Sequence, residues 1–463
     1  MKTWSRFSVV GLTIVLFLSM LLAACGAPSA SAPASTSDPA GAAVTNEAAP
    51  TSASAATSVP VDGASVASSP ATNTQPVVLK FFHWIGNDAG PVVEEINKRF
   101  ETENPGITVE FESLQTDQYD TVLKTRLAAG DAPDVFGVFP GTKKDPFVSA
   151  GYLMDLSSEP WAARVSQGSL GVAINDNKVY ALPMDQNVLG VIYNKKIFAD
   201  LGLEVPKTWD QFLEVSQKIK DAGSTPIALG NKDLWVTQLI PFAMAPSKIY
   251  RDNPMFDQEM YDGKMSFAGS DAWKKMMADY IELDKRGFFN KGVLGTTYDQ
   301  TVQLISSEKA VMTVNGNWMI APIKQANPDI NLGMFPLPYT EDGTEPWVSS
   351  AVGSMMAISS STKHPEEAQK YVEFWARPDI MALYLKEKKA YATLTDVDVD
   401  LDPAAAEMVP ALKVGSYNFL DQKWPIGVQD QMFKDIQGVF AGSITIDEMF
   451  QNMDKVFQEN KDK

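Results

Sequence analysis

The sequence predicts an α/β fold of two lobes, each with a mixed, mostly parallel sheet flanked by helices. Two observations lead to this fold class. From Val77 onward, short apolar strands alternate with amphipathic helices, and that order favours parallel β-α-β units. The segment from residue 77 to residue 463 is also too long for one hydrophobic core, so two lobes are expected.

The alternation is clearest at the start of this segment. Three strands and two helices are expected in turn, over residues 77–82, 91–102, 107–111, 118–129 and 134–139. Ligands of parallel sheets bind at the carboxyl ends of the strands. The strand-end loops 83–90 and 139–145 are therefore the first places in which to look for a site.

Later elements follow from the same patterns. A strand is expected over residues 190–193, and a helix starts at the capping-box pair Thr208 and Gln211. Further amphipathic helices are expected over residues 269–286, 362–376 and 446–460. No short-period repeat is visible, which excludes solenoids and propellers.

The composition excludes several classes of partner and site. Among 463 residues, 57 are acidic and 39 basic, for a net charge of −18. This balance argues against binding to nucleic acid or to an anionic membrane surface. One cysteine and two histidines leave no disulfide framework and little room for a zinc centre. No cofactor is expected.

One acidic pattern resembles a calcium loop. Asp396, Asp398, Asp400 and Glu407 occupy its positions 1, 3, 5 and 12. Leu401, however, stands where the loop requires glycine for its turn. We interpret the segment as a solvated acidic loop and expect no metal.

The N-terminus has the layout of an exported, tethered protein. Residues 1–24 combine basic residues, an apolar run and small residues, as in a signal peptide. Cys25 follows directly and resembles the lipidated cysteine of bacterial lipoproteins; a buried cysteine on an uncleaved anchor helix is the alternative. Residues 25–76 then form a segment rich in Ala, Ser, Thr and Pro, which we expect to be a disordered tether.

A series of short motifs occurs in one order along the chain. They are Ala129–Val135 (AGDAPDV), Tyr180–Pro183 (YALP), Ile192–Lys195 (IYNK), Gly202–Trp209 (GLEVPKTW), Thr225–Ala228 (TPIA), Lys309–Met312 (KAVM), Asn315–Trp318 (NGNW), Phe335–Pro338 (FPLP) and Ala357–Ser359 (AIS). This series resembles the family 1 extracellular solute-binding proteins of ABC importers, in particular the carbohydrate-binding branch of raffinose and multiple-sugar type. The resemblance covers about residues 77–463.

This resemblance implies a type II periplasmic-binding-protein-like fold in which the chain crosses between lobes three times. The crossings would fall after Pro183, near Gly353 and within 410–415. The implied lobes are residues 77–185 with 355–412, and residues 186–354 with 413–463.

The resemblance also implies what the protein does. It would bind a carbohydrate, with an oligosaccharide expected, by hinge closure and deliver it to the transmembrane subunits of an ABC permease. We expect a monomer without enzymatic activity, outside the cytoplasm and anchored to the membrane through Cys25.

Sugars require aromatic platforms for their C–H faces and polar groups for their hydroxyls. The candidate platforms are Trp84, Trp235, Trp318, Trp347 and Trp424; for each of them, core packing is the alternative. Four other tryptophans are expected to be structural: Trp161, Trp209, Trp273 and Trp375.

The candidate polar ligands lie beside these tryptophans or after the first crossing. They are Asn87, Asp88, Asp185, Gln186, Asp233 and Asn317. Asp185 and Gln186 could equally stabilise the hinge.

Two other functions compete with sugar binding. A secreted glycoside hydrolase would use paired carboxylates, which are common in any acidic protein. A binding protein for a non-sugar solute, such as a polyamine or a phosphate ester, is the other; the tryptophan-rich loops argue for a sugar.

Overall fold

The computed structural model describes residues 76–462, except the side chains of Asn87 and Asp88. The expected signal peptide, Cys25 and nearly all of the expected tether lie outside the described residues. Within residues 76–462, no helix combines the length and apolar character needed to span a bilayer.

Most of the strands form one mixed sheet in the order β2-β1-β3-β10-β6-β8-β7, with β11 on β10 and β9 on β6, and β4 and β5 pair separately. The strands are β1 (Val77–Phe82), β2 (Ile107–Glu112), β3 (Val135–Val138), β4 (Ile174–Asn175), β5 (Lys178–Val179), β6 (Leu182–Asn194), β7 (Thr225–Ile227), β8 (Ala310–Gly316), β9 (Leu332–Phe335), β10 (Val348–Ile358) and β11 (Ser416–Tyr417). The expected parallel start is confirmed, because β1 pairs in parallel with both β2 and β3. The central pairs, β3 with β10, β10 with β6 and β6 with β8, are antiparallel.

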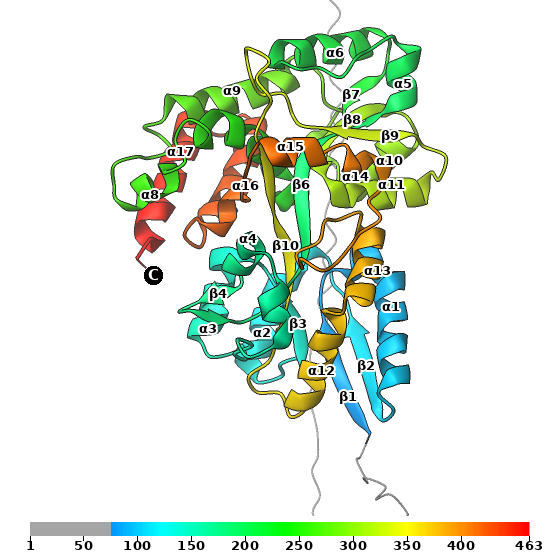
Figure 1. Cartoon of the computed structure of the whole chain (residues 1–463). Coiled ribbons are helices and arrows are strands. Elements are labelled where there is room, and N and C mark those ends of the chain that lie inside the picture. The colour runs from blue at the N-terminus through cyan, green and yellow to red at the C-terminus, as the bar shows by residue number, and fades with distance from the viewer. Residues whose placement is uncertain (1–75, 463) are drawn as a thin grey trace, which may run out of the picture. The chain divides into compact units, whose positions relative to one another are not determined.

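Helices surround this sheet. The α-helices are α1 (Gly86–Glu103), α2 (Thr116–Ala129), α3 (Asp145–Ser149), α4 (Gln167–Gly171), α5 (Lys195–Asp200), α6 (Trp209–Asp221), α7 (Leu239–Ala245), α8 (Phe256–Tyr261), α9 (Asp271–Lys285), α10 (Tyr298–Ser306), α11 (Ile320–Ala326), α12 (Pro365–Trp375), α13 (Pro378–Lys388), α14 (Pro403–Ala406), α15 (Val409–Val414), α16 (Val428–Phe440) and α17 (Ile446–Asn460). Single-turn segments are η1 (Gly141–Lys144), η2 (Pro160–Arg164), η3 (Leu234–Gln238), η4 (Pro246–Tyr250), η5 (Val293–Gly295), η6 (Asn317–Met319) and η7 (Leu420–Gln422). Helices α1, α12 and α13 pack together beside strands β1–β3 (Figure 1).

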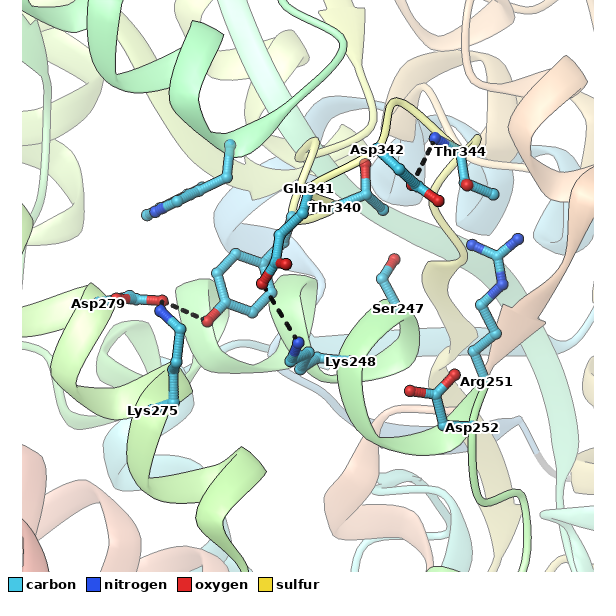
Figure 2. Close-up of a pocket in the computed structure, with 12 residues that line it drawn as sticks. Ser247, Lys248, Arg251, Asp252, Lys275, Asp279, Thr340, Glu341, Asp342 and Thr344 are labelled. Carbon is cyan, nitrogen blue, oxygen red and sulfur yellow. Dashed lines mark hydrogen bonds and ion pairs between the residues drawn. The ribbon is translucent and has the colours of Figure 1, made fainter.

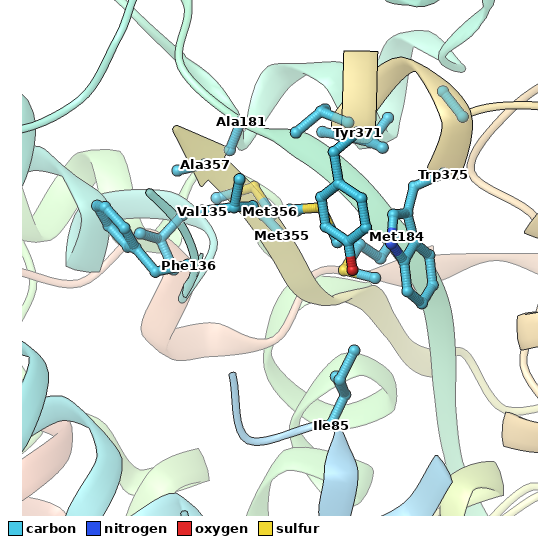
Figure 3. Packing of buried hydrophobic residues seen from close by; sticks show 14 of the residues in the cluster. Ile85, Val135, Phe136, Ala181, Met184, Met355, Met356, Ala357, Tyr371 and Trp375 are labelled. Atoms are coloured by element: carbon cyan, nitrogen blue, oxygen red, sulfur yellow. The ribbon is translucent and has the colours of Figure 1, made fainter. Parts of the chain in front are cut away.

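The buried side chains fall into separate clusters, as expected for two lobes. The first cluster takes its members from residues 79–184 and 352–397, and we call this part of the chain the N-lobe. Figure 3 shows Tyr371 and Trp375 of α12 packed against Met184 and Met355 in it. Two further clusters share the strands β6 and β8 and build the C-lobe.

The long strands β6 and β10 carry the first two crossings. Met184 lies in the N-lobe cluster, whereas Leu189 on the same strand lies in a C-lobe cluster. The third passage falls between Val397 and Ala404, earlier than the implied 410–415, because α14 and α15 bury apolar side chains against β9 and β10. The lobe limits stay otherwise a prediction.

Two element boundaries differ from expectation. Helix α1 begins at Gly86, ahead of Pro91, and contains a kink at Ala89. Strand β6 extends over Leu182–Asn194 instead of the expected 190–193. The other expected helices occur within a few residues of their predicted ends.

Candidate functional site

Asp185 lies where β6 and β10 cross between the lobes, and its side chain is 1% exposed. The carboxylate accepts hydrogen bonds from the amides of Gly353 (3.1 Å) and Ser354 (3.0 Å) and from the Ser354 hydroxyl (2.9 Å). The Tyr384 hydroxyl and the Asn187 amide group donate two more, each at 2.9 Å. These donors occupy the carboxylate and hold β10 at its irregular register, so Asp185 stabilises the hinge.

Two other candidate polar residues, Asn317 and Gln186, also bind hinge strands. Asn317 is fully buried; it accepts from the Val188 amide (2.7 Å) and donates to Asn187 (2.9 Å). The half-buried Gln186 donates to the Ser350 hydroxyl at 2.9 Å. The geometry therefore gives this polar group a structural role around the crossings.

Half-buried aromatic rings form a row on the C-lobe. Trp235 of η3 lies 5.1 Å from Tyr298 and 6.4 Å from Trp318, measured between ring centroids. Trp318 of η6 lies 6.3 Å from Phe419 in an edge-to-face arrangement. We call Tyr298, Trp235, Trp318 and Phe419 the aromatic row. Each of the four residues is half-buried, so none of them is a fully enclosed core residue.

Local backbone features place two rings of the row. A methyl group on Gly316 would overlap the Trp318 ring, so the Gly-x-Trp motif lets the ring lie on the backbone of β8. The Asp233 carboxylate accepts from the Tyr298 amide at 2.6 Å. Asp233 thus joins the start of α10 to η3 and sets Tyr298 beside Trp235; contact between Asp233 and the solute stays a prediction.

The N-lobe adds a carboxylate near this row. Asp117 stands in the first turn of α2 and is exposed; partial loss of solvent raises its pKa, as does the nearby charge of Asp233. A hydrogen bond with the Leu234 backbone opposes this rise. Asp117 therefore lies near Leu234 of η3, although it belongs to the other lobe.

The two expected strand-end loops of the N-lobe do meet. Trp84 stacks on Phe139 with centroids 4.3 Å apart and an angle of 16°, and meets Tyr119 in an edge-to-face arrangement. Trp84 is only 8% exposed, so most of its ring serves packing. Asn87 and Asp88 lie in the first turn of α1, and their side chains are outside the described residues.

Trp424 and Trp347 lie outside the aromatic row. Trp424 is 1% exposed, packs against Phe242, Phe267 and Trp273, and donates to Asp257 at 3.3 Å. It is thus a core residue. Trp347 is half-buried, and its indole covers Gly415, where a methyl group would overlap the ring.

Within the described residues, the aromatic row lines neither of two surface hollows. A hollow of about 400 Å³ lies on the C-lobe between η4, α9 and the loop before β10. Two ion pairs lie in it, Lys248 with Glu341 (3.6 Å) and Lys275 with Asp279 (2.7 Å) (Figure 2). No candidate residue from the sequence lines it.

Three of the four acidic residues in the calcium-like pattern form ion pairs. Asp396 binds Arg164 (2.7 Å), Asp400 binds Lys386 (2.9 Å), and Glu407 binds Lys195. Within residues 76–462, no group of three or more His, Cys, Asp or Glu side chains is placed to hold a metal ion.

Sequence reasoning missed three residues near the row: Tyr298, Phe419 and Asp117. Tyr298 and Phe419 lie in segments without an aromatic motif. Asp117 follows the carboxyl end of β2, so the strand-end rule applied to that strand could have found it.

Comparisons with known proteins agree with this architecture. Residues 85–382 match the family model described as "Bacterial extracellular solute-binding protein". The multiple sugar-binding protein of Streptococcus mutans is 30% identical over 338 residues, which cover 72% of this chain and 76% of that protein. The melibiose/raffinose/stachyose-binding protein MelE of Bacillus subtilis is 23% identical over 73% of this chain and 79% of its own.

Solved structures give the same fold. The solute-binding protein RafE in complex with raffinose superposes with a TM-score of 0.72 at 27% identity, covering 83% of this chain and 100% of that one. A chitin oligosaccharide binding protein superposes with a TM-score of 0.73 at 24% identity, covering 83% of this chain and 99% of that one. The fold, the two crossing strands and the family match lead to one conclusion: this chain belongs to the bacterial extracellular solute-binding proteins.

Proposed function

We propose that this protein binds an oligosaccharide between its lobes and delivers it to the transmembrane subunits of an ABC permease. The aromatic row carries the proposal. Its four residues come from separate turns of the C-lobe and are all half-buried, and a line of aromatic rings suits the successive C–H faces of linked sugar rings. Asp117 offers an acceptor for hydroxyl groups from the opposite side.

The relatives support the sugar assignment. A multiple sugar-binding protein and a raffinose complex of RafE are similar to this chain over most of its folded part. A phosphate ester would call for basic residues at the site, and the aromatic row consists of uncharged rings. A polyamine could use the same rings and carboxylates, so it is the alternative to be tested.

Binding is tested by calorimetry and thermal shift on the chain from residue 76 with raffinose, stachyose, a chitin trisaccharide, glucose and spermidine. We expect a trisaccharide or tetrasaccharide to raise the melting temperature and to bind with a Kd of about 1 μM, equivalent to about −8 kcal/mol. Stabilisation by spermidine alone would overturn the carbohydrate proposal. The same mixtures, assayed for released monosaccharide, test the glycosidase alternative: release would overturn the assignment as a binding protein only.

The proposal includes the export and anchoring of the chain. Residues 1–24 would be cleaved and Cys25 lipidated, which leaves the folded part outside the cytoplasm as a tethered monomer. Metabolic labelling with a fatty acid should mark the wild-type protein and not the Cys25→Ala variant. Equal labelling of both would refute lipidation at Cys25.

A further inference from the structure

The segment of residues 416–424 touches three parts of the molecule. It begins with β11, carries Phe419 of the aromatic row, and ends with the buried Trp424. The Thr142 hydroxyl of the N-lobe donates to the Trp424 carbonyl at 2.7 Å. The 416–424 segment thus joins the aromatic row to the opposite lobe.

One buried carboxylate binds both ends of this segment. Asp257 of α8 is 5% exposed and accepts from three aromatic donors. The Tyr250 hydroxyl donates at 2.8 Å, the Tyr417 hydroxyl at 2.9 Å and the Trp424 indole at 3.3 Å. Two of these donors, Tyr417 and Trp424, stand on either side of Phe419 in the sequence.

Further contacts strengthen the same anchor. Tyr250 and Tyr417 stack with their centroids 3.8 Å apart and at an angle of 16°. The Lys423 ammonium donates to the Tyr417 hydroxyl at 3.1 Å and lies 4.4 Å from that ring. Both ends of the 416–424 segment are therefore fixed to α8 and η4, while Phe419 remains half-buried between them.

We infer that Asp257 is a positioning residue for solute binding, which acts by fixing the 416–424 segment and thereby the place of Phe419 beside Trp318. The inference rests on the proposed function for its binding readout. Asp257 does not belong to the aromatic row; its effect reaches the solute through Phe419 and through the Thr142 contact. Removal of the carboxylate leaves buried aromatic donors without an acceptor, which frees both ends of the segment.

The test compares Asp257→Leu, Asp257→Asn and a matched control, Asn97→Leu. Asn97 is also 5% exposed and accepts from a buried tyrosine, Tyr371, at 2.6 Å, but it belongs to the N-lobe core. Both leucine variants remove the acceptor of a buried tyrosine, so both should lower the melting temperature. Only the loss at Asp257 should affect the 416–424 segment.

Hydrogen exchange of the protein without sugar gives the first readout. Amides of residues 416–424 should exchange about tenfold faster in Asp257→Leu than in wild type or Asn97→Leu. Unchanged exchange there would overturn the inference. This measurement needs no solute, so it remains decisive even where raffinose fails to bind the wild-type protein and the proposed function itself is rejected.

Raffinose calorimetry gives the second readout. The Kd should rise about tenfold in Asp257→Leu, less in Asp257→Asn, and stay within about twofold of wild type in Asn97→Leu. In the double variant Phe419→Ala/Asp257→Leu, the Kd should rise by less than the product of the fold increases in the two single variants, since both changes act on one contact. Wild-type affinity in Asp257→Leu, or fully multiplicative losses, would overturn the inference.

Discussion

At the residue scale, Trp318 is the clearest member of the aromatic row, because Gly316 leaves the space for its ring on β8. The Trp318→Ala variant should bind raffinose about 1–3 kcal/mol more weakly, which is roughly fivefold to 150-fold in Kd. Calorimetry measures the loss, and an unchanged circular dichroism spectrum serves as the control for folding. Wild-type affinity would show that Trp318 only packs.

His83 gives the second prediction at this scale. It is fully buried at the end of β1, and burial, together with the charge of Lys388, lowers its pKa from 6.5 to about 3. Between about pH 3 and pH 6.5, His83 is therefore protonated in the unfolded chain and neutral in the folded protein. The contribution of His83 to the free energy of unfolding is fully present above pH 6.5 and is lost as the pH falls below that value.

The expected slope from this one group is about 1.4 kcal/mol per pH unit below pH 6.5. Urea unfolding of the wild type and of His83→Gln, from about pH 5 to about pH 7, measures it as the difference between the two slopes. Parallel slopes would contradict the prediction. The range stops at about pH 5 because the carboxylates titrate below it.

Part of the site could be predicted residue by residue. Trp318 and Trp235 lie in short motifs, and the structure brings their rings together. Asn317 was expected to bind the solute, and Asp185 to bind the solute or stabilise the hinge; their hydrogen-bond partners, Val188 and Ser354, lie on the crossing strands. A sequence does not reveal which polar side chain a strand irregularity will capture.

At the scale of elements, the capping of α17 can be tested directly. The Thr445 hydroxyl accepts from the Glu448 amide at 3.2 Å, and the Glu448 carboxylate accepts from the Thr445 amide at 2.7 Å. Thr445→Ala should lower the free energy of unfolding by about 1 kcal/mol, as measured in urea. Thr445→Ser keeps the hydroxyl and should lose far less; equal losses would contradict the capping role.

The helices were easier to predict than the long strands. Caps and apolar periodicity placed α6, α9, α12 and α17, because these signals are local. Strand β6 was predicted only over residues 190–193, since the polar residues Asp185–Asn187 interrupt its apolar pattern. The strand continues through them because β10 supplies hydrogen-bond partners along that stretch. The residues of β10 lie far from β6 in the sequence, so local patterns do not reveal this pairing.

At the scale of the whole molecule, the crossing strands set how the lobes are joined. A methyl group on Gly353 would overlap the Asn187 side chain and come within 2.7 Å of the Asp185 carboxylate. Gly353→Ala should therefore cost about 1–3 kcal/mol of stability. Gly295→Ala, where nothing lies within 4 Å of the added carbon, is the matched control. Urea unfolding measures the free energy of unfolding of both variants, and equal values would contradict the prediction.

The continuous sheet has a thermodynamic consequence beyond solute binding. Strand β6 contributes Leu182 and Met184 to one core and Leu189 and Val191 to the other. If one lobe unfolded alone, β6 would lose part of its pairing with the adjacent strands, and apolar side chains of both cores would be exposed. The two lobes should therefore unfold as one cooperative unit. Scanning calorimetry should show one endotherm with equal calorimetric and van't Hoff enthalpies. Two resolved endotherms would mean that each lobe is a separate folding unit despite the strands they share.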